Sequence, residues 1–336
     1  MWQSGEEMVR REGLLLYTKE DLKTMQAWSL KRKIQVTQTR IIEWCQHFNG
    51  QVYISFSGGK DSTVLLDLAR RIYPDIKAVF VDTGLEYPEL REFIKNIDNV
   101  TWLKPSMNFR KVIETYGYPL GSKKTALNIE YGKKARERGD TEQYEKYING
   151  KRYGKKNGEV YYYGAVAKRF LPLVDDDSIK VSSKCCSVMK EKPLIEFEKE
   201  SGLKPIVGLM AAESKRRELA WLRTGCNAFD GARSMSKPMS FWTEQDVLLY
   251  LKKFKVPYAS VYGEIKQNDD GKYYTTGSSR TGCVFCGFGC HLEKEPNRFQ
   301  RLKVTHPNLW EYCLKPWDEG GLGMKEVLDK IGVKSD

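Results

Sequence analysis

Apolar residues fall into two patterns that alternate along residues 50–260. Short apolar runs predict buried strands, and apolar residues at helical spacing predict helices. The predicted strands are 52–56, 77–81, 100–103 and 205–209, and the predicted helices are 62–72, 88–97, 107–116, 190–201, 213–222 and 243–254. Strands that alternate with helices are typical of an α/β fold with a mostly parallel sheet and helices on both faces.

Helical patterns without strands lie at both ends of the chain. Two predicted helices precede the first strand and three short ones close the chain, at 18–30, 35–48, 296–303, 307–314 and 324–331. We therefore expect a helical lead-in over 1–48, an α/β domain over 49–260 and a cysteine-rich, helical C-terminal subdomain over 261–336.

A polar segment interrupts the alternation at 119–171, within an insertion that we assign to residues 119–180. Residues 119–171 carry 13 Lys and Arg against 6 Asp and Glu. The segment is also rich in tyrosine, with Tyr131, Tyr144, Tyr147, Tyr153, Tyr161, Tyr162 and Tyr163. Basic side chains contact nucleic-acid phosphates while aromatic rings stack on bases, so the composition fits a nucleic-acid surface. It fits a solvated excursion without a partner equally well.

The composition of the whole chain narrows the class of protein. A net charge of +12 and a pI near 9.1 favour a polyanionic partner. No apolar run reaches the length of a membrane span, and residues 1–11 lack the apolar core of a signal peptide. We therefore expect a cytoplasmic protein without a membrane partner. In that reducing compartment the eight cysteines are expected to be thiols or metal ligands rather than disulfides.

The stretch Ser57-Gly-Gly-Lys-Asp-Ser62 lies between the first predicted strand and its helix. Gly58 and Gly59 let the backbone approach an anion, and free amides at a helix start attract negative charge. Lys60 adds a positive charge, and the hydroxyls of Ser57 and Ser62 can donate hydrogen bonds. The stretch therefore predicts a phosphate-binding loop. The alternative is a Ser/Gly surface turn before an ordinary helix.

Two further groups are expected near this loop. Asp82, Thr83 and Gly84 follow the second predicted strand, and open α/β sheets bind ligands at the carboxyl ends of their strands. Arg216 and Arg217 follow the strand predicted at 205–209, and an arginine there can hold a phosphate or sulfate through two hydrogen bonds. The alternatives are that residues 82–84 form an ordinary strand-to-helix turn and that the basic cluster around Arg216 and Arg217 mostly faces solvent.

Two cysteine pairs indicate a metal centre. The adjacent pair Cys185-Cys186 and the C-x-x-C pair Cys283 and Cys286 supply four thiolates, which suit a [4Fe–4S] cluster or a structural zinc ion. Cys290 either replaces one member of the adjacent pair or is a free redox-active thiol near the metal. The remaining cysteines fit core or surface positions: Cys45, Cys226 and Cys313.

Taken together, these motifs resemble the phosphoadenosine-phosphosulfate reductase family. The loop is similar to the PP-loop of ATP pyrophosphatases. The resemblance continues in family order through Val81–Glu89, Cys185–Leu194, Gly208–Arg217, Pro238–Val247 and Thr281–Gly287. It implies an adenine-nucleotide α-hydrolase-like (Rossmann-like) fold. The cysteine layout is similar to that of the cluster-bearing adenylylsulfate reductases, which favours iron–sulfur over zinc.

Two departures separate the chain from the reductases that it resembles. Those reductases use a cysteine in a C-terminal Glu-Cys-Gly-hydrophobic-His motif, which residues 311–336 lack. Their PP-loop also tends to be altered, whereas Lys60 and Asp61 are intact here. The resemblance therefore implies an ATP pyrophosphatase that adenylates an acceptor for sulfur insertion and forms AMP and pyrophosphate.

The resemblance also implies roles for the predicted site residues. Lys60 and Ser62, with the other residues of the loop, would stabilise the charge on the departing pyrophosphate. Asp61 would help to hold the Mg²⁺ that bridges the phosphates of ATP. Asp82 and Thr83 would position the adenosine.

Relatives that combine such a loop with a cysteine-bound cluster are the ATP pyrophosphatases of DNA phosphorothioation, whose motif order is the more similar, and the tRNA thiolation enzymes. They imply DNA or tRNA as the acceptor and a sulfur donor such as a cysteine desulfurase, and they leave a homo-oligomer open. Two alternatives from other classes stand beside this hypothesis. One is a reductase that binds an adenylyl sulfate-type nucleotide and uses Cys290 as its nucleophile. The other is a non-catalytic nucleic-acid-binding protein with a structural metal.

Overall fold

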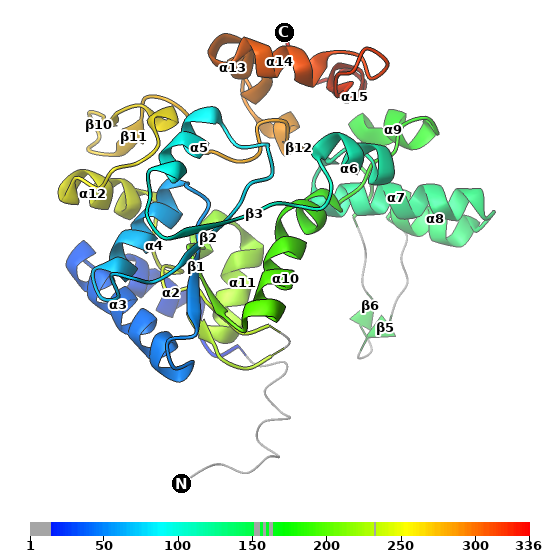
Figure 1. Ribbon diagram of the computed structural model, residues 1–336. Coiled ribbons are helices and arrows are strands. Elements are labelled where there is room, and N and C mark those ends of the chain that lie inside the picture. Colours follow the sequence, from blue (N-terminus) through cyan, green and yellow to red (C-terminus); the bar gives the residue numbers. More distant parts are fainter. Residues whose placement is uncertain (1–14, 151–154, 157–158, 161–163, 232) are drawn as a thin grey trace. The chain divides into compact units, whose positions relative to one another are not determined.

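The computed structural model describes residues 15–150, 155–156, 159–160, 164–231 and 233–336 (Figure 1). The contacts within the chain group it into two compact units. The first comprises Met1–Asp82, Tyr87–Leu103 and Leu194–Thr281, and the second comprises Thr83–Glu86, Lys104–Pro193 and Gly282–Asp336. The domain boundaries predicted at 48/49 and 260/261 stay a prediction.

A six-stranded sheet organises the first unit, in the order β3-β2-β1-β7-β9-β8. Its strands are β1 (Val52–Ser55), β2 (Ala78–Val81), β3 (Val100–Leu103), β7 (Lys204–Val207), β8 (Asn227–Ala228) and β9 (Met235–Ser236). All neighbouring strands are parallel except β8 and β9, which pair antiparallel. The prediction of a mostly parallel α/β sheet is therefore confirmed.

Burial along the central strands shows that both faces of this sheet are covered. Successive residues of a strand point to opposite faces, and both Tyr53 and Ile54 of β1 are 0 % exposed. The same holds for Val79 and Phe80 of β2, which are both buried. Helices supply most of the cover: α2 (Lys19–Gln26), α3 (Leu30–His47), α4 (Lys60–Arg70), α5 (Pro88–Lys95), α10 (Lys192–Ser201), α11 (Lys215–Thr224) and α12 (Glu244–Phe254).

The break between the first two helices was predicted in the wrong place. The sequence pattern places it between residues 30 and 35, whereas α3 already begins at Leu30. Ser29 sets this boundary because its hydroxyl accepts a hydrogen bond from the backbone N–H of Arg32, as an N-cap does. Residues 30–34 are helical, and this conformation packs Leu30 and Ile34 against the core.

The second unit is mainly helical. It contains α6 (Phe109–Tyr116), α7 (Lys123–Glu137), α8 (Thr141–Ile148), α9 (Leu171–Asp175), α13 (Arg298–Thr305), α14 (Pro307–Leu314) and α15 (Met324–Lys330). Short strand pairs join β4 (Leu120–Gly121) to β12 (Gly287–Phe288) in this unit, and β5 (Lys155–Lys156) to β6 (Glu159–Val160). In the first unit, β10 (Ile265–Gln267) pairs with β11 (Tyr273–Thr275).

The basic segment at 119–171 is more regular than its composition indicates. Helices α7 and α8 pack closely at Gly132. A Cβ atom at this position would overlap the side chain of Ile148. Ile129 and Ile148 are buried in this packing. Of the tyrosines predicted to form a nucleic-acid surface, Tyr153, Tyr161, Tyr162 and Tyr163 lie outside the described residues.

The first prediction concerns the buried ion pair that joins α3 to α12. Lys33 is 1 % exposed, and its Nζ lies 2.6 Å from Asp246 Oδ2 and 2.7 Å from the carbonyl oxygen of Gln26. Asp246→Asn leaves the buried ammonium without its counter-charge. We expect the free energy of unfolding, measured by urea denaturation, to fall by about 3 kcal/mol.

Two comparisons make this test specific. The double variant Lys33→Met/Asp246→Asn removes both charges and is expected to recover part of the loss. Glu92→Gln, which breaks the exposed pair with Lys95, should cost less than about 0.5 kcal/mol. A loss for Asp246→Asn no larger than that of Glu92→Gln would contradict the assignment.

Candidate functional site

The loop after β1 has the backbone of an anion site. Gly58 has φ +70°, which favours glycine, and a Cβ atom there would lie 2.7 Å from Ile94 Cδ1, so a larger residue would have to displace the Ile94 side chain. Gly59 is the residue before α4, and no side chain caps this helix. The Lys60 N–H donates to the hydroxyl of Tyr262, whereas among the described residues nothing accepts from the N–H groups of Asp61 and Ser62, which are therefore available for an anionic ligand.

The two predicted hydroxyls close the loop on itself. Ser57 Oγ and Ser62 Oγ lie 3.0 Å apart, and the Ser57 N–H donates to Ser62 Oγ at 3.2 Å. Ser62 Oγ also donates to the carbonyl oxygen of Gly59 at 2.9 Å. The structure thus brings Ser57 and Ser62 together, as the phosphate-loop hypothesis requires.

Lys60 is buried at the start of α4, with 5 % of its surface exposed. Its Nζ donates to the carbonyl oxygen of Ser279 at 2.6 Å and lies 3.0 Å from Glu244 Oε1. Its backbone N–H donates to the hydroxyl of Tyr262 at 3.1 Å. Tyr262 Oη and Thr281 Oγ1 are 2.6 Å apart. The segment 279–281 is therefore attached to Lys60 at two points. Ser279 contacts Lys60 directly, and Thr281 contacts it through the hydroxyl of Tyr262.

Asp61 has a carboxylate oxygen without a partner. Burial raises the pKa of Asp61 and Glu244 raises it further, while Lys60 opposes both. Among the described residues, nothing hydrogen-bonds to its buried Oδ1. An unsatisfied buried oxygen is costly, and carboxylate oxygens are the ligands that Mg²⁺ prefers. Asp61 therefore fits the predicted role at a divalent cation.

The loop lies at the switch point of the sheet, where β1 has β2 on one side and β7 on the other. Gly208 follows β7, and a Cβ atom there would lie 3.3 Å from the backbone of Asp61 and Ser62. Of the two predicted arginines, Arg216 is exposed, whereas Arg217 is partly buried. Burial and the charge of Arg280 lower the pKa of Arg217, and the charge of Asp61 raises it. Arg217 also forms an ion pair with Glu213, and its interaction with the charge of Asp61 puts it near the loop, whereas no such interaction is seen for Arg216 among the described residues.

The residues predicted to position adenosine have partners of their own. Asp82 is 7 % exposed, and its Oδ2 lies 2.7 Å from Arg91 Nη2. Thr83 donates its backbone N–H and its hydroxyl to the carboxylate of Glu86, at 3.1 Å and 2.8 Å. Gly84 supplies a positive φ of +72° to this turn. The role of Asp82, Thr83 and Gly84 in nucleotide binding stays a prediction.

The four cysteines predicted as metal ligands share one region of the second unit. Burial raises the pKa of Cys185, and the charges of Cys283, Cys186 and Cys286 raise it further. Burial raises the pKa of Cys283 to about 11, and Lys190 opposes that rise. Among the described residues, however, no three His, Cys, Asp or Glu side chains converge in the geometry of a metal site.

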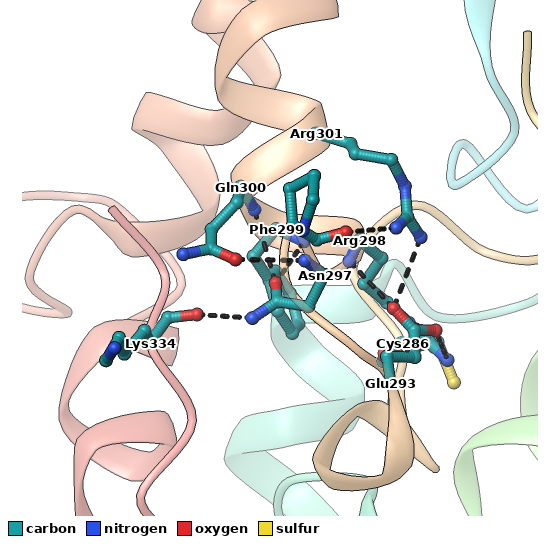
Figure 2. Close-up of polar contacts among 9 residues, drawn as sticks. Cys286, Glu293, Asn297, Arg298, Phe299, Gln300, Arg301 and Lys334 are labelled. Carbon is teal, nitrogen blue, oxygen red and sulfur yellow. Dashed lines mark hydrogen bonds and ion pairs between the residues drawn. The ribbon is translucent and has the colours of Figure 1, made fainter.

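Two cations accompany these sulfur atoms. Burial lowers the pKa of Lys190, but the charges of Cys283 and Glu86 and a hydrogen bond to Cys283 outweigh burial and raise it overall. Arg298 Nη1 donates to the carbonyl oxygen of Cys286 at 2.7 Å (Figure 2). Positive charge beside cysteines favours the thiolate, so the residues fit a four-thiolate centre in donor type and charge.

Figure 2 shows how Arg298 is held beside Cys286. Its Nε and Nη2 donate to Glu293 Oε1 at 2.8 Å and 2.6 Å, which is a two-point contact with one carboxylate. Asn297 caps α13 by accepting from the backbone N–H groups of Phe299 and Gln300. Its Nδ2 donates to the carbonyl oxygen of Lys334 at 2.7 Å. The C-terminal segment therefore fixes the position from which Arg298 reaches Cys286.

Cys290 is buried rather than presented to a substrate. It is 1 % exposed, and its Sγ donates to the carbonyl oxygen of Gly287 at 3.1 Å. Burial raises its pKa to about 11. The cysteines expected in core or surface positions, Cys45, Cys226 and Cys313, are all buried.

Several residues near the loop were not predicted there: Glu244, Ser279 and Tyr262, which contact Lys60, Thr281, which contacts Tyr262, and Arg280, whose charge acts on Asp61. A single weak signal was available, since Arg280 and Thr281 directly precede Gly282-Cys283 in a polar segment. Their approach to Lys60 depends on tertiary packing, which a pattern along the chain does not contain.

Comparison with known proteins gives one family match. The family model for the phosphoadenosine phosphosulfate reductase domain matches residues 51–288. An adenosine 5′-phosphosulfate reductase of Staphylococcus epidermidis is 24% identical over 271 residues, which cover 76% of this chain and 87% of that protein.

A second relative is longer than this chain. An uncharacterised protein of Methanocaldococcus jannaschii is 26% identical over 261 residues, and these cover 77% of this chain but only 40% of that protein. A solved phosphoadenylyl-sulfate (PAPS) reductase from Candida auris is 12% identical with a TM-score of 0.37, over 74% of this chain and 92% of that one.

The second prediction tests the shape of the loop with two alanine substitutions. Gly58 and Gly50 both have positive φ, but only at Gly58 would a Cβ atom meet another side chain. We expect Gly50→Ala to cost about 1 kcal/mol for the left-handed backbone alone, and Gly58→Ala to cost about 2 kcal/mol or more. Urea denaturation measures both. Equal losses would show that Ile94 does not constrain the loop.

Proposed function

The chain belongs to the phosphoadenosine phosphosulfate reductase family, and we propose that it cleaves ATP between the α and β phosphates to adenylate an acceptor. One observation carries this proposal. The loop keeps both Lys60, buried at the start of α4, and Asp61, whose Oδ1 has no partner among the described residues. A pyrophosphate group in the loop, with its divalent cation, would satisfy both side chains.

In the proposed reaction, a nucleophilic atom of the acceptor bonds to the α phosphorus of ATP. The bond from that phosphorus to the oxygen bridging to the β phosphorus breaks, and pyrophosphate leaves with the electron pair. Negative charge grows on the departing group in this step. The Lys60 ammonium and the N–H groups of Asp61 and Ser62 would stabilise that charge more strongly in the transition state than in bound ATP.

Asp61 is the residue that would hold Mg²⁺ in this site. When bound, the cation neutralises phosphate charge as the pyrophosphate leaves. Asp61 is suited to this because Lys60 lies beside it and opposes the rise that burial causes in its pKa. Ser57 and Ser62 would exchange their mutual hydrogen bond for bonds to phosphate oxygens.

Nucleic acid, either DNA or tRNA, is the acceptor class that we propose. A shallow cavity of about 250 Å³ on α7 and α8 supports this class, because it is lined by Tyr131, Lys134, Arg138, Gln143 and Tyr147. The rings of Tyr131 and Tyr147 lie 5.2 Å apart, edge to face. Aromatic faces beside basic side chains suit bases and phosphates of a single strand.

Sulfur insertion would follow adenylation, with the sulfur supplied by a donor such as a cysteine desulfurase. We propose that Cys185, Cys186, Cys283 and Cys286 hold a [4Fe–4S] cluster, with zinc as the alternative. When bound, the cluster would either carry sulfur or stabilise the second unit. Lys190 and Arg298 favour ionised sulfur ligands in either case.

The third prediction tests ATP cleavage directly. Anaerobically purified protein is incubated with ATP and Mg²⁺, with and without DNA or tRNA, and pyrophosphate is measured. We expect Lys60→Ala to lower kcat/KM by about 100-fold or more, because the buried cation acts on the leaving group. Lys95→Ala, an exposed lysine on α5, is the matched control and should keep full activity.

A second candidate function is sulfonucleotide reduction, which the named relatives favour. It predicts sulfite release from adenylyl sulfate with a thiol donor and no pyrophosphate from ATP. The burial of Cys290 and its hydrogen bond to Gly287 make this residue a poor nucleophile. Sulfite formation without ATP cleavage would overturn the adenylation proposal, and nucleic-acid binding without either turnover would favour the non-catalytic alternative.

The fourth prediction tests the proposed metal ligands. We expect Cys283→Ala and Cys286→Ala to lose bound metal, measured as iron and zinc content and as visible absorption after anaerobic purification. Cys290→Ala should keep it, because the Cys290 thiol already donates to a carbonyl oxygen. Cys313→Ala, a buried cysteine on α14, controls for the loss of a core thiol. Equal metal content in all four variants would contradict the ligand set.

A further inference from the structure

We propose that Arg280 binds the pyrophosphate group in the loop and acts there together with Lys60 and Arg217. This inference rests on the proposed function and extends it to a residue outside the motifs of the loop. Its basis is the way in which the backbone on both sides of Arg280 is attached to the phosphate loop.

The residues on both sides of Arg280 are anchored to the loop. The carbonyl oxygen of Ser279 accepts a hydrogen bond from Lys60 Nζ at 2.6 Å. Thr281 Oγ1 lies 2.6 Å from the hydroxyl of Tyr262, and this hydroxyl accepts from the backbone N–H of Lys60. Thr281 Oγ1 would also lie 3.6 Å from a Cβ atom at Gly59. The backbone of Arg280 is therefore held within a few ångströms of the predicted anion site.

The side chain of Arg280 makes no hydrogen bond or ion pair with the described residues of the first unit. Arg280 is exposed, and among the described residues no hydrogen bond or ion pair involves its guanidinium. Ion pairs do occupy other arginines of this unit, such as Arg91 with Asp82 and Arg233 with Glu198. The Arg280 guanidinium is therefore available to a ligand in the loop without breaking an ion pair.

The charges around the loop also favour an anion. The charge of Arg280 lowers the pKa of Arg217, and it acts on Asp61 in the direction of ionisation. Lys60 adds a third cation and the start of α4 adds partial positive charge. Glu244 pairs with Lys60, Glu213 pairs with Arg217, and Asp61 is the third carboxylate, so among the described residues Arg280 is the cation of this group that has no ion pair. A pyrophosphate group with a divalent cation complements this arrangement better than a nucleoside monophosphate, because it offers more oxygens for two-point guanidinium contacts.

Isothermal titration with inorganic pyrophosphate and Mg²⁺ tests the inference without requiring turnover. We expect Arg280→Ala to weaken binding by about 10- to 100-fold, since one charge-assisted contact is lost. Arg280→Lys keeps the charge but not the planar fork, so it should lie between wild type and Arg280→Ala. Arg223→Ala removes an exposed arginine near the end of α11 and should bind like wild type.

Each outcome decides the inference. Equal affinity of Arg280→Ala and Arg223→Ala, or no pyrophosphate binding by the wild type, would overturn it. Restoration of Arg280→Ala binding by added methylguanidinium would support a direct contact, because a merely structural defect is not repaired by a free guanidinium. Binding that depends on Arg280 in a protein that releases no pyrophosphate from ATP would refute the proposed reaction and leave this inference intact.

Discussion

The buried ammonium of Lys60 is the constraint on which the loop depends. A cation at the start of a helix is opposed by the partial positive charge of the helix end, and burial adds a desolvation cost. Among the described residues, Lys60 Nζ forms an ion pair with the carboxylate of Glu244, which belongs to a largely exposed side chain, and Asp61 is a second carboxylate nearby. Ser279 and Tyr262 supply the remaining polar contacts. An anion bound in the loop, as we propose, would add a counter-charge for this buried cation.

The residues that contact Lys60 directly precede the C-x-x-C cysteines in the sequence. Thr281 is the last residue of the first unit, and Gly282 and Cys283 follow directly in the second. The residues that hold Lys60 are therefore separated from a predicted metal ligand by one glycine. This proximity along the chain follows from sequence order alone, so it holds for any arrangement of the two units. One continuous segment, 279–283, therefore carries both the residues that contact the phosphate loop and the first cysteine of the C-x-x-C pair.

Local patterns predicted the parts of the fold that local physics determines. The buried runs at β1, β2 and β3 and the helix that begins at Pro88 follow from apolar spacing and a proline at the first turn. The loop residues Ser57, Lys60 and Asp61 were recognisable because a helix start and two glycines define the site locally. Arg280 and Tyr262 were not, because their contacts join residues about 200 positions apart in the chain. The partial burial that separates Arg217 from Arg216 likewise depends on packing against other elements.

The family relationship and the site geometry constrain the chemistry in different ways. The match over residues 51–288 establishes the family, and its named relatives reduce adenosine 5′-phosphosulfate. Reduction by a cysteine nucleophile requires an accessible sulfur of low pKa, whereas Cys290 is buried and donates to a backbone carbonyl. Cleavage of ATP requires a cation at the leaving group and an oxygen ligand for Mg²⁺. Lys60 and Asp61 would supply these two groups from one turn of helix, and this is the basis on which we propose ATP rather than a sulfonucleotide as the substrate.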